Sequence, residues 1–198
     1  MTASTGAGTG SGTRAEPDDG GADELGPPAD PLEVARLICL RQLEMAPRTR
    51  AQLATTLTKR RIPPEAAEEV LDRFVQVGLI DDGAYALAWV ESRHRGRGLA
   101  RRALSQELRQ RGVAEPEATV ALDTLDPEQE LTTARRLVDR KLASTARLET
   151  AARVRRLVSM LARKGYPPAV ALRVVREALG DEAAEPAALD MLADPSDD

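Results

Sequence analysis

The sequence is poor in aromatic residues, since one tryptophan, two tyrosines and one phenylalanine make up only 2% of its 198 residues. Valine, threonine and aromatic residues rarely alternate with polar ones, which argues against a β-sheet. Hydrophobic residues nevertheless amount to 42% of the chain, enough for a core of leucine, valine and alanine. The composition therefore predicts an all-helical protein.

The chain has only one cysteine and one histidine. Cys39 lies in the apolar run LICL and is predicted to be a buried small hydrophobic residue, and a single cysteine excludes an intramolecular disulfide. His94 stands among arginines with no second metal ligand and no neighbouring nucleophile, so we interpret it as part of a basic surface. We expect no enzyme activity, no cofactor and no metal site.

Long hydrophobic runs are also missing. No apolar segment approaches the roughly 20 residues that cross a bilayer, and the first residues contain no apolar signal region. We therefore expect a cytoplasmic protein without membrane contact.

The net charge of −4 conceals a division between the ends and the middle. Residues 1–31 carry one basic side chain against six acidic ones, and residues 181–198 carry seven acidic side chains and no basic one. Residues 32–180 then hold 27 lysines and arginines against 19 acidic residues, a balance of +8. The part of the chain that can fold is thus basic, which favours an acidic partner.

Helix signals begin near Leu32, after an arm rich in glycine, serine, threonine and proline. The sequence 49–52, TRAQ, is typical of a capping box, and Pro64 suits the first turn of a third helix. Asp81 or Asp82 can cap the helix that follows, which explains this pair better than a catalytic carboxylate pair.

The apolar pattern of this segment recurs twice, at intervals of 51 and 53 residues. The matching columns align without a gap: Leu53, Leu104 and Leu157; Leu57, Leu108 and Leu161; Ile62, Val113 and Tyr166; Ala67, Ala118 and Ala171; Leu71, Leu122 and Val175. Such self-similarity predicts three tandem three-helix repeats that form an elongated, curved body with disordered termini.

The predicted organisation has five parts. From the N-terminus they are a disordered arm at 1–31, repeat 1 at 32–80, a basic repeat 2 at 81–125, repeat 3 at 126–180 and an acidic disordered tail at 181–198. In repeat 2, Tyr85, Ala88 and Trp89 are expected to pack inward. Gly96 and Gly98 are expected to end that helix.

A second helix of repeat 2, expected from Gly98 to Arg111, has an apolar side at Ala100, Leu104 and Leu108. Between residues 92 and 113 seven arginines face the single acid Glu107, a balance typical of a surface that binds phosphates or carboxylates. A solvated helix face is the alternative interpretation. The predicted partner-binding residues are Arg93, Arg95, Arg97, Arg101, Arg102, Arg109, Arg111, Arg155, Arg156, Arg163 and Lys164.

Several short motifs occur here in a fixed order: LIDD at 79–82, Tyr85-Ala86, Arg93, Gly98, LRQRGV at 108–113 and RKGY at 163–166. Together they resemble the signature of the RecX family of recombination regulators, over about residues 32–180. The resemblance implies three-helix repeats and binding in the groove of a RecA filament on single-stranded DNA, with inhibition of ATP hydrolysis and strand exchange during DNA repair and recombination.

A second hypothesis is a free-standing nucleic-acid-binding module, since each repeat contains helix pairs joined by short turns. The scarcity of aromatic, asparagine and glutamine residues on the basic helices argues against base-specific recognition, so such binding would be mainly non-specific. We expect the chain to act as a monomer.

Overall fold

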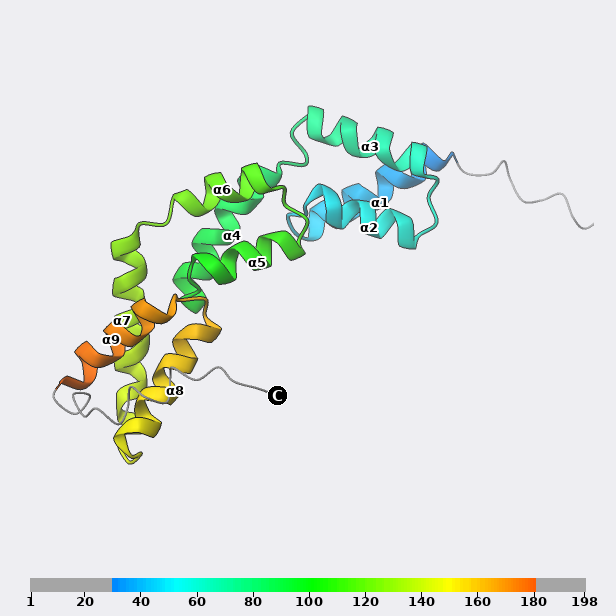
Figure 1. Cartoon of the computed structure of the whole chain (residues 1–198). Helices are drawn as coiled ribbons and strands as arrows, with labels where there is room; N and C mark the ends of the chain where they lie inside the picture. Colours follow the sequence, from blue (N-terminus) through cyan, green and yellow to red (C-terminus); the bar gives the residue numbers. More distant parts are fainter. Residues whose placement is uncertain (1–29, 181–198) are drawn as a thin grey trace, which may run out of the picture. The chain divides into compact units, whose positions relative to one another are not determined.

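The computed structural model describes residues 30–180, and this part of the chain contains nine α-helices and no strand (Figure 1). The helices are α1 (Pro31–Met45), α2 (Arg50–Lys59), α3 (Pro64–Gln76), α4 (Asp82–Arg97), α5 (Arg101–Gln110), α6 (Glu115–Asp123), α7 (Pro127–Thr145), α8 (Thr150–Arg163) and α9 (Pro168–Leu179). The all-helical prediction is confirmed. The predicted disordered tail at 181–198, and all but the last two residues of the predicted arm, lie outside the described residues.

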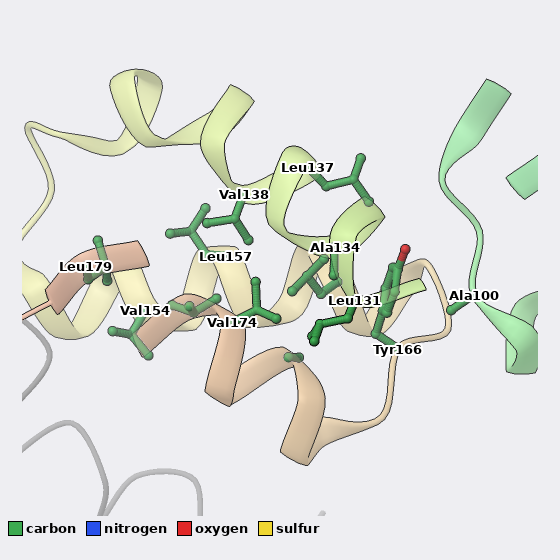
Figure 2. Close-up of a cluster of buried hydrophobic side chains, with 13 residues drawn as sticks. Ala100, Leu131, Ala134, Leu137, Val138, Val154, Leu157, Tyr166, Val174 and Leu179 are labelled. Atoms are coloured by element: carbon green, nitrogen blue, oxygen red, sulfur yellow. The ribbon is translucent and has the colours of Figure 1, made fainter. Parts of the chain in front are cut away.

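The helices pack in three groups of three, and in each group the third helix contacts the first and the second. Each group has its own hydrophobic core. The core of α7, α8 and α9 is drawn in Figure 2, where Val138, Leu157 and Val174 approach one another from the three helices. The prediction of three tandem three-helix repeats is therefore confirmed.

The repeated leucine columns form the centre of each core. The side chains at the first two columns are at most 1% exposed, and they are Leu53, Leu104, Leu157, Leu57, Leu108 and Leu161. Cys39 is also fully buried, and this burial raises the pKa of its thiol to about 11. The thiol thus stays neutral and acts as a small core residue, as predicted.

The second helix of every repeat ends in the same turn. A residue in the left-handed region follows the helix, with φ 59° at Arg61, 75° at Gly112 and 89° at Gly165. The next backbone amide donates to the carbonyl of the last core leucine; the bond from Val113 to Leu108, for example, is 3.1 Å long. This is the Schellman pattern, in which a left-handed residue lets the chain satisfy the last carbonyls of a helix.

The preceding repeat explains why two of these turns contain glycine. A side chain at Gly112 would overlap the Cβ of Ala51 on α2, and one at Gly165 would lie 2.7 Å from the Cβ of Ala103 on α5. Arg61 belongs to the first described repeat, so within residues 30–180 no preceding repeat packs on its turn. A non-glycine residue is tolerated there at the cost of backbone strain.

The predicted helix starts are largely correct. Thr49 and Gln52 form the capping box, and the Asp81 side chain accepts a hydrogen bond from the amide of Ala84 at 2.8 Å. The boundary between α4 and α5 was predicted wrongly. Gly96 remains helical, only Gly98 takes a left-handed φ of 63°, and α5 begins at Arg101 instead of Gly98.

Contacts with repeat 3 account for the later start of α5. The amide of Ala100 donates to the carbonyl of Lys164 at 2.8 Å, and the Tyr166 hydroxyl donates to the carbonyl of Gly98 at 3.2 Å. Ala100 is 1% exposed and joins the core of repeat 3 beside Tyr166 (Figure 2). These bonds hold the residues before α5 in a non-helical conformation.

Substitutions at the three turns should have opposite effects on stability. Gly112→Ala and Gly165→Ala each force a Cβ into the left-handed region and against a neighbouring helix, so each should lower the free energy of unfolding by about 2 kcal/mol or more. Arg61→Gly relieves the same backbone strain without a packing cost and should leave the protein equally stable or up to about 1 kcal/mol more stable. Urea denaturation followed by circular dichroism measures all three, and a destabilised Arg61→Gly variant would contradict this explanation.

Candidate functional site

The helices that carry the predicted binding arginines are held by contacts between repeats. These contacts lie at the start of the second helix in repeats 1 and 2. The first amide of α2, at Arg50, donates to Asp82 Oδ1 of repeat 2 at 2.9 Å. The first amide of α5, at Arg101, donates in the same way to Glu130 Oε1 of repeat 3 at 2.8 Å. A carboxylate at a helix N-terminus satisfies a free amide and interacts favourably with the helix dipole. Repeats 2 and 3 thus each cap a helix of the repeat before them.

A second contact accompanies each cap. The Thr49 hydroxyl donates to the carbonyl of Arg111 at 2.6 Å, whereas the amide of Ala100 donates to the carbonyl of Lys164. Arg111 and Lys164 occupy the same place in the turns of repeats 2 and 3, one residue before Gly112 and Gly165. The two junctions are therefore built alike. The second junction fixes the start of α5 against repeat 3.

Two of the predicted binding arginines belong to a cluster around Trp89. The guanidinium carbons of Arg93 and Arg111 lie 4.0 and 3.5 Å from the centre of the Trp89 ring, and Tyr85 stacks on Trp89 at 5.8 Å between ring centres. The indole N–H of Trp89 donates to Glu107 Oε2 at 2.8 Å. Cation–π contacts and a charged acceptor hold these side chains in place. Arg93 and Arg111 are thus engaged within repeat 2.

The expectation that Tyr85, Ala88 and Trp89 face the core was partly wrong. Tyr85 and Trp89 are half-buried against the core of repeat 2, but Ala88 is exposed. The residues of α4 that are fully buried are Ala86 and Val90. The helix is rotated relative to the prediction because the large rings pack against arginines at the edge of the core.

The outer face of α5 carries arginine without acidic residues. Leu104 and Leu108 point into the core, as predicted, while Arg102 and Arg109 are exposed. Glu107, which is the one acidic residue of α5, is turned toward Trp89 and lies 3.7 Å from Arg93. The exposed face of α5 is consequently cationic.

Arg101 has a different role, because its side chain pairs with Asp123 of α6 at 2.8 Å and its amide is capped by Glu130. Lys164 is also held inside a junction, where its ammonium donates to the carbonyl of Arg97 at 2.6 Å. Burial, and secondarily the charges of Arg140 and Arg97, lower the pKa of Lys164. Arg101 thus links α5 to α6 and to repeat 3, and Lys164 links repeat 3 to the end of α4.

The remaining predicted residues are exposed. Arg95 pairs with Glu91 on the same helix at 2.7 Å, and Arg97 lies at the end of α4. The helix α8 contains no acidic residue, and it exposes Arg155, Arg156 and Arg163. We refer to Arg102, Arg109, Arg155, Arg156 and Arg163 as the α5/α8 arginines. They are the part of the predicted set whose charges face solvent from helices that offer no exposed acid.

His94 was misplaced by the sequence interpretation, since it is half-buried between repeats 2 and 3. Its Nδ1 lies 2.9 Å from the carbonyl oxygen of Leu99, and its Nε2 lies 3.2 Å from the hydroxyl of Thr133. A carbonyl only accepts, so Nδ1 carries a proton, and in the neutral ring Nε2 accepts from the Thr133 hydroxyl. The histidine is a contact residue of the second junction.

Sequence reasoning also missed a groove of about 1390 Å³ between α4 and α7. Its walls come from helices about 45 residues apart, so no local pattern could indicate it. Within residues 30–180, no group of three or more histidine, cysteine, aspartate or glutamate side chains is arranged to hold a metal ion. In the same part of the chain, no helix is long and apolar enough to span a membrane.

The cap at Asp82 should make stability depend on pH. Burial, and secondarily the nearby charge of Glu117, raise the pKa of Asp82 although the amide of Arg50 opposes this. The carboxyl of Asp82 therefore binds its proton more tightly in the folded state than in the unfolded chain. As the pH rises above the ordinary pKa of an aspartate, this carboxyl must ionise in the folded protein, and the free energy of unfolding falls.

Asp82→Asn keeps an oxygen acceptor for Arg50 and removes the buried charge, so it should equal or exceed the wild type in stability at pH 7. This advantage should shrink as the pH falls toward 4. Asp82→Ala removes the acceptor and should lose about 1 kcal/mol relative to Asp82→Asn at every pH. Urea titrations of both variants between pH 4 and pH 8 measure this, and a pH-independent difference between Asp82→Asn and the wild type would contradict the assignment.

Comparison with known proteins gives a consistent result. Three family models match in succession: the first three-helix domain of RecX at residues 35–74, the second at 81–122 and the third at 128–175. Regulatory protein RecX of Streptomyces coelicolor is 61% identical over 171 residues, which cover 83% of this chain and 91% of the relative. Regulatory protein RecX of Thermobifida fusca is 58% identical over 158 residues, which cover 80% of this chain and 85% of the relative.

Two solved structures share the fold. The crystal structure of RecX from Lactobacillus salivarius has a TM-score of 0.69 at 17% identity and covers 75% of this chain and 97% of its own. A second crystal structure of regulatory protein RecX has a TM-score of 0.68 at 25% identity and covers 75% and 73%. With three consecutive domain matches and relatives of this identity, the chain belongs to the RecX family of regulatory proteins.

Proposed function

We propose that this chain regulates the RecA recombinase by binding the RecA filament on single-stranded DNA. The α5/α8 arginines make the central contacts, and binding inhibits ATP hydrolysis and strand exchange. RecA and its DNA lie in the bacterial cytoplasm, so the chain acts there. The regulatory role follows from the family, whose relatives are regulatory proteins RecX.

The observation that carries this proposal is the orientation of Glu107. It is the only acidic residue on α5, and its bond to Trp89 turns it away from Arg102 and Arg109. The helix α8 has no acidic residue at all. The charges of Arg102, Arg109, Arg156 and Arg163 are thus available to an external acidic group, whereas an ordinary solvated helix face carries both signs.

Arginine suits a filament of protein and nucleic acid because its planar fork binds carboxylates and phosphates by two parallel hydrogen bonds. Several such contacts on a preformed scaffold also steer association at long range. The same chemistry allows some non-specific affinity for naked DNA, which is the second hypothesis, but no described feature favours base recognition.

The chain is proposed to act as a monomer, because both ends of its repeat series are closed. The turn of repeat 1 has Arg61 where the inner turns need glycine to approach a preceding repeat. The N-terminus of α8 is capped by its own Glu149, which accepts from the amides of Ala151 and Ala152. Among residues 30–180, neither end of the series offers the contacts that join the inner repeats.

The test is ATP hydrolysis by the cognate RecA on single-stranded DNA, titrated with wild type and with the double variant Arg102→Glu/Arg109→Glu. Both arginines are exposed, and their side chains form no hydrogen bond or ion pair with any other residue between 30 and 180, so the fold should be kept, whereas Arg101 would be a poor choice because of its bond to Asp123. The wild type should inhibit, and the double variant should need at least about tenfold more protein for half inhibition, equivalent to roughly 1.4 kcal/mol.

Arg41→Glu/Arg73→Glu is the matched control, because it changes the net charge equally on exposed residues of α1 and α3. It should inhibit nearly as well as the wild type. Equal loss in both double variants would show a bulk charge effect. Unimpaired inhibition by Arg102→Glu/Arg109→Glu would remove α5 from the interface, and equally tight binding to DNA with or without RecA would favour the nucleic-acid-binding hypothesis.

A further inference from the structure

The turn that ends α2 differs from the corresponding turns after α5 and α8, because within residues 30–180 no preceding repeat covers it. Gly112 and Gly165 each lie against the second helix of the repeat before them. At the end of α2 the equivalent residues are exposed and basic. We refer to them as the α2 turn cations, and they are Lys59, Arg60 and Arg61.

The residue before the left-handed position is basic in all three repeats, but the fold uses its side chain only in repeats 2 and 3. Arg111 lies over the Trp89 ring, and the ammonium of Lys164 donates to the carbonyl of Arg97. Arg60 is the equivalent residue of repeat 1. Neither its side chain nor those of the other α2 turn cations form a hydrogen bond, ion pair or ring contact with any residue between 30 and 180.

The sequence around the α2 turn cations has no acidic residue. Residues 49–64 contain four basic side chains and no acidic one. The first of the four, Arg50, already pairs with Glu68 and Asp72. Glu65 follows in the first turn of α3 and forms no ion pair with the α2 turn cations. The end of α2 therefore presents three positive charges that no ion pair within the described residues neutralises.

Backbone strain at Arg61 indicates a use for its side chain. Among residues 30–180 it is the one non-glycine residue with φ in the left-handed region, at 59°. Glycine adopts this conformation without strain and occupies the same place in repeats 2 and 3. The helix dipole accounts for Lys59 in the last turn of α2, but it gives no reason to keep a strained arginine beyond the helix. A strained residue that the fold does not require points to a binding role.

The surroundings of the α2 turn cations favour phosphates of a polymer. None of the exposed large hydrophobic residues of the described part lies between residues 46 and 74. Protein interfaces, by contrast, centre on apolar and aromatic anchors and are poor in lysine. Small ligands bind in concave pockets that bury most of their surface. A nucleic-acid backbone instead gains affinity from several exposed cations together, because each phosphate contact releases counterions.

We infer that the α2 turn cations bind the phosphate backbone of a nucleic acid. The site contacts phosphates without reading bases, because residues 53–64 contain no aromatic, asparagine or glutamine side chain. It is a site in repeat 1, separate from the α5/α8 arginines. The inference goes beyond the proposed function, since it concerns nucleic acid in the absence of RecA.

Fluorescence anisotropy of a labelled oligothymidylate, titrated with the full-length protein at several salt concentrations without RecA, tests the inference. For the wild type, log affinity should fall linearly with log salt concentration. The variant Lys59→Gln/Arg60→Gln/Arg61→Gly should bind at least about tenfold more weakly at about 0.1 M salt, with a slope shallower by about 1 to 2, because each lost phosphate contact removes about 0.7. Arg61→Gly alone should make the slope shallower by about 0.7 without lowering stability, so unfolding would not explain the change.

Arg41→Gln/Arg73→Gln/Lys141→Gln is the matched control, because it removes three charges from exposed residues of α1, α3 and α7 that form no ion pair within the described part. It should keep nearly the wild-type slope. An equal loss in this control, an unchanged slope in both turn variants or no binding by the wild type would overturn the inference. Wild-type DNA binding by the triple turn variant, together with weaker inhibition of RecA, would assign these cations to the recombinase surface and would also overturn it. The inhibition test of Arg102→Glu/Arg109→Glu is independent of these titrations, so the two proposals can fail separately.

Discussion

The arrangement of the described repeats depends on one interaction, in which a carboxylate of one repeat caps the second helix of the repeat before it. Asp82 does this for α2, and Glu130 does it for α5. Each cap lies beside a turn whose glycine permits close approach of the backbone. Because only Ala100 enters the core of another repeat, these polar junctions largely decide how α2 and α5 are held. The proposed binding surface lies on α5, which such a cap holds, and on α8, whose N-terminus is capped by Glu149 of its own repeat.

The same interaction links the local sequence to the candidate function. The backbone amide of Arg101 donates to Glu130, and its side chain pairs with Asp123. The unpaired positive charge on the exposed face of α5 therefore comes from Arg102 and Arg109. The hydrogen bond from Trp89 to Glu107 makes the exposed face of α5 more cationic, because it turns the one acidic side chain of this helix away from Arg102 and Arg109. A cationic face thus results from where the acidic residues are bound, as well as from the number of arginines.

Periodicity predicted the parts of the fold that depend on one helix or one turn. The leucine columns, the capping box at Thr49 and the cap at Asp81 were all predicted, because a helix of 3.6 residues per turn and its free amides impose them locally. The start of α5 was not predicted, because it depends on a hydrogen bond from the amide of Ala100 to the carbonyl of Lys164 in the next repeat. The burial of His94 and the groove between α4 and α7 depend on the same kind of distant contact.

The central claim, that the α5/α8 arginines bind the RecA filament, is tested most directly by arginine footprinting. The full-length protein would be treated with phenylglyoxal, alone and bound to RecA on single-stranded DNA, and the modified residues quantified by mass spectrometry. Binding through these helices should reduce modification at Arg102, Arg109, Arg156 and Arg163 in the complex and leave Arg41 and Arg73 unchanged. Protection of Arg41 and Arg73, with the α5/α8 arginines modified as in the free protein, would contradict it.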